Sequence, residues 1–108
     1  MANVNRVIII GNLTRDPEVK FSQTGTAVLE IALAIERKYL VMGVVKEETT
    51  YVDISAFGKV AELVAARCKE GSSIFVEGRL KLESWTTKVG AKRSKLAVVA
   101  EGIQLLDE

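Results

Sequence analysis

The sequence contains no histidine and only one cysteine, Cys68. A disulfide framework and a Cys/His zinc site both need several such residues, so neither can form within the chain. Catalysis that uses histidine as an acid, a base or the activator of a nucleophile is excluded for the same reason. We therefore expect no metal and no cofactor, and the lone thiol is compatible with a reducing compartment.

Long apolar runs and a strong excess of one charge are missing too. The apolar run near the N-terminus covers only residues 7–10, which is too short for a signal peptide or a membrane-spanning helix. The 15 basic and 14 acidic residues give a net charge of +1, so composition alone does not indicate nucleic acid as a partner. We expect a cytoplasmic protein without a membrane partner.

What is present is typical of one compact domain. The chain has 108 residues, of which 48% are apolar and 27% are charged, and no repeat or linker divides it. This length is sufficient for a single hydrophobic core. We expect one domain over residues 1–108.

Alternating and β-branched apolar residues predict a mainly β protein. In residues 29–36 the period of two is strict, which favours a strand although alanine, leucine and glutamate prefer helices. Gly11 indicates a bulge or a bend of the kind that closes barrels. The main strands are expected at residues 4–14, 27–39, 49–59, 73–82 and 95–105, with a short one at 19–21.

One helix is expected at residues 60–69, where apolar residues recur at helical spacing and Gly71 follows as a C-terminal cap. The strand after the helix should face the core with Ile74, Val76, Gly78, Leu80 and Leu82. The order predicts an all-β, five-stranded Greek-key barrel of the oligonucleotide/oligosaccharide-binding (OB) kind, with one helix between the third and fourth strands.

Residues 40–48 are too apolar for a solvated loop. We expect the flanking strands to continue into a hairpin with its turn near Met42 and Gly43. The other interpretation of the Leu40 to Val45 segment is an apolar surface for contact between subunits.

Segment 49–59 carries the strongest indication of function. Its core face should hold Val52, Ile54 and Ala56, while the opposite face presents Tyr51, Asp53, Ser55 and Phe57. Aromatic side chains on a partly polar sheet face invite stacking by a flat ligand. Packing against a neighbouring strand or subunit is the alternative for both rings.

Two further aromatic residues and a group of basic residues extend this pattern. Tyr39 lies at a strand end, and Trp85 lies in a polar hairpin connection expected at residues 83–92. Basic side chains nearby would neutralise phosphates, or would simply be solvated charges. The candidates are Lys59 and Lys81, and the cluster Lys88, Lys92, Arg93 and Lys95.

No catalytic constellation is found. Glu47 and Glu48 are adjacent and would point to opposite faces of a strand, and Asp53 has no acidic partner nearby in the pattern. Gly58 and Lys59 lack the upstream glycine and the following hydroxyl residue of a phosphate-binding loop, and no GxGxxG occurs. We expect no enzymatic activity.

The chain resembles bacterial single-stranded DNA-binding proteins in short motifs that span nearly its whole length. These are NRV at 5–7, GNL at 11–13, DPE at 16–18, FGK at 57–59, EGRL at 77–80, and Trp85. The resemblance implies an OB barrel that assembles as a homotetramer and binds single-stranded DNA without sequence preference, in the cytoplasm at the nucleoid, in replication, recombination and repair. It implies stacking on Tyr39, Tyr51, Phe57 and Trp85, and phosphate contacts from Arg6, Lys59 and Lys81.

The chain also departs from the family pattern. Asp53 and Glu83 stand where well-known members carry basic residues. The acidic C-terminal tail that recruits replication and repair proteins is expected to be missing, because the chain stops at Asp107 and Glu108; such partners are expected only if a tail exists beyond it. The alternative functions are a primosome-type accessory barrel that acts through protein contacts, and a structural or sugar-binding barrel.

Overall fold

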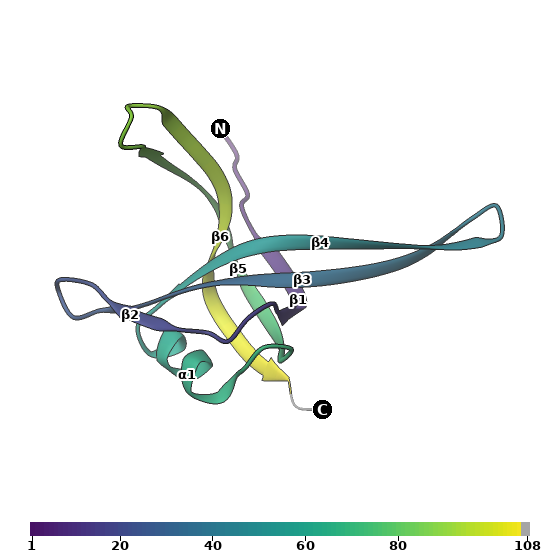
Figure 1. Cartoon of the computed structure of the whole chain (residues 1–108), viewed down its shortest axis with the longest axis horizontal. Coiled ribbons are helices and arrows are strands. Elements are labelled where there is room, and N and C mark those ends of the chain that lie inside the picture. Colours follow the sequence, from purple (N-terminus) through teal and green to yellow (C-terminus); the bar gives the residue numbers. More distant parts are fainter. Residues whose placement is uncertain (107–108) are drawn as a thin grey trace.

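The computed structural model describes residues 1–106; the acidic end, Asp107 and Glu108, lies outside the described residues. Six strands and one helix follow one another along the chain (Figure 1). Their bounds are β1 Val7–Leu13, β2 Val19–Phe21, β3 Ala27–Val41, β4 Val44–Phe57, α1 Lys59–Arg67, β5 Ser73–Thr86 and β6 Lys92–Leu106.

Five of the strands close into a barrel. β1 pairs antiparallel with β5, β5 with β6, and β3 with β4, while β6 and β4 pair in parallel. Closure comes from β1, which passes from β5 to β3 at its end, where Asn12 pairs with Ala34 and Leu13 with Leu33. The predicted OB barrel is confirmed, with α1 between its third and fourth strands; β2 adds to the edge of β3.

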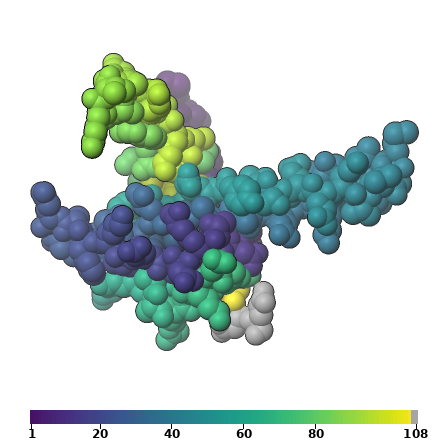
Figure 2. Space-filling model, in the orientation of Figure 1, coloured from purple at the N-terminus to yellow at the C-terminus, as the bar shows by residue number. Residues whose placement is uncertain are grey.

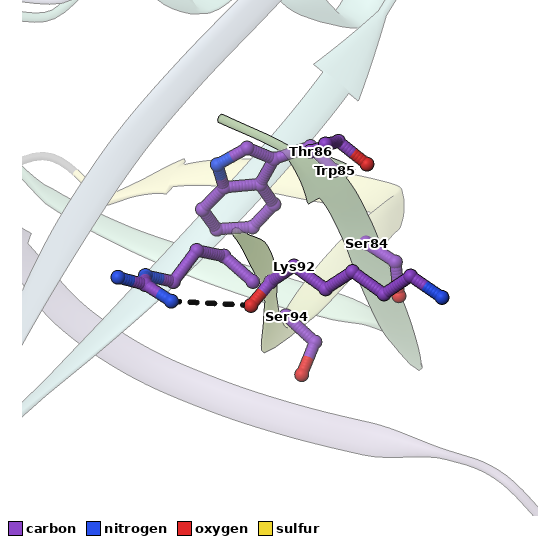
Figure 3. Close-up of a pocket in the computed structure, with 6 residues that line it drawn as sticks. Ser84, Trp85, Thr86, Lys92 and Ser94 are labelled. Carbon is purple, nitrogen blue, oxygen red and sulfur yellow. Dashed lines mark hydrogen bonds between the residues drawn. The ribbon is translucent and has the colours of Figure 1, made fainter. Parts of the chain in front are cut away.

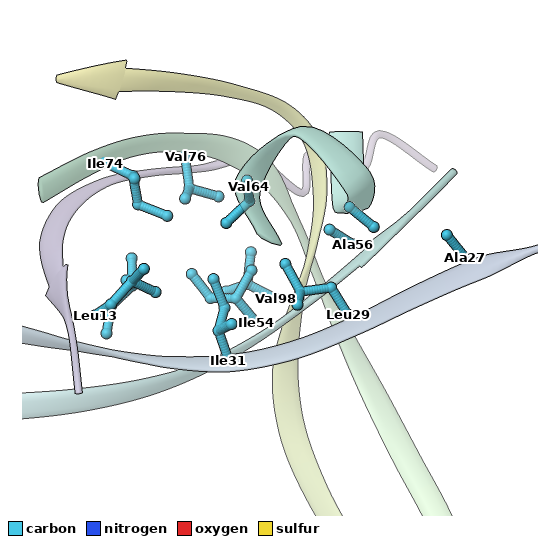
Figure 4. Close-up of a cluster of buried hydrophobic side chains, with 12 residues drawn as sticks. Leu13, Ala27, Leu29, Ile31, Ile54, Ala56, Val64, Ile74, Val76 and Val98 are labelled. Atoms are coloured by element: carbon cyan, nitrogen blue, oxygen red, sulfur yellow. The ribbon is translucent and has the colours of Figure 1, made fainter. Parts of the chain in front are cut away.

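The core lies inside this barrel and under α1. Leu29, Leu33 and Ile54 are fully buried, and Val64 of α1 joins Ile74 in the same cluster (Figure 4). Burial of each such side chain stabilises the fold by roughly 1.5–3 kcal/mol. The alternation in residues 27–39 and 49–59 predicts these core faces, except that Ser55, expected on the exposed face, is buried where β4 meets β6.

Gly78 marks the point where β5 leaves the barrel. The register of β5 and β6 shifts between Glu77 and Gly78, and a Cβ atom at residue 78 would lie 2.1 Å from the carbonyl oxygen of Val99. Only glycine fits so close an approach of two backbones. Beyond this bulge Leu80 and Leu82 are 40% and 62% exposed, so the prediction that they face the core is wrong.

Two hairpins project from the barrel as arms (Figure 2), and the molecule reaches 54 Å along its longest axis. We call them the β3–β4 arm (residues 36–49) and the β5–β6 arm (residues 79–97). The turn predicted at Met42 and Gly43 is confirmed: both have positive φ angles, 51° and 79°, which match the twist of a two-residue hairpin.

Two local predictions are wrong. The helix ends at Arg67, with Cys68 as its cap, so Gly71 is not the cap residue. Gly71 instead lies in the following turn, where its N–H donates to the carbonyl oxygen of Leu13 at 2.8 Å. The connection expected at residues 83–92 is shorter, because β5 runs to Thr86 and β6 starts at Lys92; Trp85 therefore lies on a strand.

Candidate nucleic-acid interface

The outer face of β3 and β4 exposes two aromatic rings beside small neighbours. Tyr51 pairs across the sheet with Ala34, and Phe57 pairs with Val28. Directly opposed residues lie on the same face, and side chains this small cannot cover a ring. Tyr51 is 69% exposed and Phe57 49% exposed. Both are free to stack with a flat ligand.

Trp85 lies on the β5–β6 arm, directly opposite Arg93, and is 46% exposed. Beside it is a hollow of about 420 Å³ (Figure 3). Ring, hydroxyl and cationic groups line this hollow: Ser84, Trp85, Thr86, Lys92, Arg93 and Ser94. The Arg93 guanidinium donates a hydrogen bond to the Lys92 carbonyl oxygen at 3.2 Å. An aromatic plane beside two cations suits a nucleotide.

Lys95 connects the two aromatic regions. Its amino group lies 3.6 Å from the Asp53 carboxylate on β4 and 3.9 Å from the Glu83 carboxylate on β5. Lys95 itself lies on β6, and the parallel pairing of Ser55 with Val99 holds β4 and β6 together at the barrel. Exposed ion pairs contribute only about 0.2–1 kcal/mol each. Their value here is positional: the face with Tyr51 and Phe57 continues into the face with Trp85.

Tyr39 is separated from this outer face. It pairs with Lys46 and alternates in phase with the core residues Leu29 and Leu33, which places it on the opposite face of the β3–β4 arm from Tyr51. The Arg37 guanidinium lies 5.2 Å from the centre of its ring. Tyr39 thus has a cation partner of its own and does not share a surface with the other three aromatics.

The predicted phosphate-binding residues are distributed over several elements. Lys59 begins α1, two residues after Phe57, and Lys81 lies on the same face of β5 as Trp85. Lys92 and Arg93 line the hollow at Trp85, while Lys88 lies in the turn at the tip of this arm.

Arg6 differs from these residues because it already has a partner. Its guanidinium forms an ion pair with the Glu77 carboxylate. The neighbouring Asn5 fixes the chain here, since its side chain exchanges two hydrogen bonds of 2.8 Å with the backbone of Leu80. A phosphate at Arg6 would have to compete with Glu77.

The described residues offer little else in the way of site chemistry. Within residues 1–106 no group of three or more histidine, cysteine, aspartate or glutamate side chains is placed to hold a metal ion. Over the same range, no helix has the length and apolar character needed to cross a membrane. The outer face instead combines aromatic rings with basic and acidic side chains.

The model of the single-strand binding protein family matches residues 4–106. The chain belongs to this family. Among curated relatives, the single-stranded DNA-binding proteins of Wolinella succinogenes and Helicobacter hepaticus are each 45% identical over 104 residues, or 95% of this chain. That of Aquifex aeolicus is 42% identical over 96% of this chain.

A solved structure agrees with these relatives. A deletion mutant of the single-stranded DNA binding protein from Thermus aquaticus superimposes with a TM-score of 0.83, at 32% identity, and covers 96% of this chain and 51% of that one. The chain spans about three fifths of the length of the Wolinella and Helicobacter relatives, 64% and 61%. Their names do not favour a primosome-type accessory function.

Some members of the surface were not identified from the sequence. Glu30, on the outer face of β3, lies beside Trp85. It also lines a further hollow of about 520 Å³, together with Arg15, Asp16, Glu18, Lys20 and Val28. The alternation in residues 27–39 shows that Glu30 faces outward. What it cannot show is that β5 and β6 lie next to β3 at this point, because that proximity comes from long-range pairing.

Proposed function

We propose that this member of the single-strand binding protein family binds single-stranded DNA and stacks bases on Tyr51, Phe57 and Trp85. One observation carries the proposal: these three rings are about half or more exposed and lie on one outer face that Lys95 joins. Stacking contributes about 1–3 kcal/mol per base in proteins of this class. Because every base has a flat face, binding needs no particular sequence.

The phosphate contacts of this proposal come from Lys59, Lys81, Lys88, Lys92 and Arg93, which border the aromatic face. Each contact releases counterions, so affinity should fall steeply as salt rises. Arg6 contributes once a phosphate displaces Glu77. Tyr39 would stack a base only on the opposite face of the β3–β4 arm. It would therefore contact DNA only where the DNA passes around that arm.

The biological role proposed is to cover and protect single strands during replication, recombination and repair, in the cytoplasm at the nucleoid, with no catalysis and no cofactor. Residues 1–108 act as one OB domain. Replication and repair proteins would be recruited only by a tail beyond this chain.

Self-association, as a homotetramer, is part of the proposal. From Val7 to Ile10, one edge of β1 pairs with β5. The other edge of this stretch has no strand partner among residues 1–106, since β1 pairs with β3 only at Asn12 and Leu13. Ile8 and Ile10 on this stretch are exposed. An unpaired edge with β-branched, apolar side chains is a template for pairing with a second copy. Sedimentation equilibrium tests it: a monomer at micromolar concentration would contradict this part of the proposal.

The test of binding uses the only tryptophan as the probe. The protein is titrated with oligo-dT while Trp85 fluorescence is followed, at several salt concentrations, with a duplex of equal length as control. We expect quenching by the single strand, tighter binding at low salt, and much weaker binding of the duplex. No quenching, or equal binding of both forms, would overturn the stacking model.

A further inference from the structure

The two faces of the β3–β4 arm differ in charge and in aromatic content. The face that continues the outer face beyond Tyr51 carries Glu36, Lys38 and Glu47. The only cation among them, Lys38, is already paired with Glu47 at 3.7 Å. Negative charge therefore exceeds positive charge on this side of the arm, and no further ring follows Tyr51 there.

The other side of the arm, which we call the Tyr39 face, has the opposite character. Its members alternate with those of the outer face along both strands. They are Arg37, Tyr39 and Val41 on β3, and Val44, Lys46 and Glu48 on β4. The two basic residues outnumber the single carboxylate, so this face attracts an anionic ligand.

Arg37 lies against Tyr39 and not against the carboxylate opposite it. Arg37 and Glu48 are directly opposed across the arm, yet they form no ion pair, and the guanidinium lies 5.2 Å from the centre of the Tyr39 ring. Lys46, directly opposite Tyr39, also forms no ion pair with any of residues 1–106. Both basic side chains are exposed. One ring and two cations without carboxylate partners thus lie together.

We propose that the Tyr39 face is a second binding surface for single-stranded DNA, so that one chain holds two segments of DNA at once. A base stacks against the pair formed by Tyr39 and Arg37, and Lys46 contacts a phosphate beside it. The inference rests on the proposed function, because the ligand is the same. It adds a separate site on each chain and assigns Arg37 and Lys46 to it.

Distance keeps the two surfaces separate. Tyr51 is paired with Ala34, and residues 34 to 39 of β3 span about 17 Å along the strand. The rings of Tyr51 and Tyr39 also project from opposite sides of the arm. Short strands therefore bind the two surfaces independently, whereas a long strand occupies both only by passing around the arm.

The test combines a probe of the outer face with a count of all bound strands. Trp85 is the only tryptophan, so its fluorescence reports strands on the outer face alone. Equilibrium dialysis counts every bound strand. Both are measured at low salt with the shortest oligo-dT that quenches Trp85 fully. We expect quenching to be complete at about one strand per chain, while dialysis reaches about two.

The double variant Arg37→Gln, Lys46→Gln removes both cations of the Tyr39 face. Dialysis should then fall to about one strand per chain, while the quenching curve of Trp85 stays as in the parent protein. The control is Arg67→Gln, Lys69→Gln, which removes the same charge at exposed positions at the end of α1 and just after it. It should keep the second strand.

The outcomes separate the inference from the function on which it rests. If Trp85 is not quenched, the proposed function fails. If quenching occurs and dialysis of the parent protein also stops at about one strand, only the inference is wrong. A second strand that persists in the double variant, or that the control loses equally, would overturn it as well. So would loss of the second strand together with loss of self-association in sedimentation equilibrium, because that strand would then lie between chains.

Discussion

The barrel and the two arms of this protein are built from the same strands but differ in what their side chains do. In the barrel, alternate residues of β3 and β4 are fully buried, as Leu33 and Ile54 show. In the arms the same strands continue with paired backbones, yet most of their side chains meet solvent. Stability is therefore expected to reside in the barrel, while the arms and the outer face are free to carry chemistry.

The arms also differ from each other. The tip of the β3–β4 arm is apolar, with Leu40, Met42 and Val45 exposed, and along its sides Lys38 pairs with Glu47 at 3.7 Å. The β5–β6 arm instead combines Trp85 with Lys92, Arg93 and the turn residue Lys88. The outer-face side chains that we propose to bind DNA are thus concentrated on the β5–β6 arm and at the base of the other arm.

The largest effect is expected from Leu33→Ala in the barrel. Removing a fully buried leucine should lower the free energy of unfolding by about 2–5 kcal/mol, as measured by urea denaturation. The same change at the exposed Leu82 should cost less than about 1 kcal/mol. Similar losses at the two leucines would contradict the division between barrel and arm.

Trp85→Ala should have the converse effect. Losing one stacked base weakens oligo-dT binding by about 1–3 kcal/mol, or about 5- to 150-fold, while stability changes little because the side chain is half-exposed. Fluorescence anisotropy of a labelled oligonucleotide measures this without the tryptophan. Phe21→Ala, an exposed aromatic on β2, serves as the control. Unchanged affinity in the Trp85 variant would remove this residue from the site.

Asp53→Arg should tighten binding of oligo-dT several-fold at low salt. The substitution replaces a negative charge on the outer face by a positive one, and it leaves Lys95 with Glu83 as its remaining carboxylate. The slope of log affinity against log salt concentration should steepen by about one, as one added phosphate contact would cause. Glu62→Arg on α1 changes net charge equally and is the control. Weaker binding with the fold intact would show that the bound DNA does not cross this face.

The smallest effect concerns the thiol beside α1. Burial raises the pKa of the Cys68 thiol above its ordinary value, because desolvation disfavours the thiolate. At neutral pH the folded protein should therefore react with iodoacetamide more slowly than the urea-unfolded chain, and the difference should shrink as the pH rises past the raised pKa. Equal rates in both states at neutral pH would contradict this assignment.

The sequence predicts the barrel well because its information is local. Alternation identifies the core faces of β3 and β4, and an apolar segment centred on Met42 and Gly43 identifies the hairpin turn. Gly71 shows the limit: its backbone is needed for a contact with Leu13, which is distant in sequence, and not for the helix end. Leu80 and Leu82 show another, since alternation gives the side of a strand but not where the barrel ends.

The candidate site depends more on long-range register. Tyr39 alternates in phase with Leu29 and Leu33, so its separation from Tyr51 was accessible from the sequence once the phase was followed to the strand end. By contrast, nothing local indicates that Lys95 reaches Asp53, because that contact requires the parallel pairing of β4 with β6. Its contact with Glu83 follows from the register of the β5–β6 hairpin.

Oxidative footprinting of the aromatic side chains tests the central claim most directly. Phe57 and Phe21 are the same residue type, both exposed, on opposite faces of the β2–β3–β4 sheet. With saturating oligo-dT, hydroxyl-radical oxidation of Phe57, Tyr51 and Trp85 should fall severalfold, while oxidation of Phe21 stays the same. Protection of Phe21 with none at Phe57 and Trp85 would contradict the claim that the outer face binds the strand.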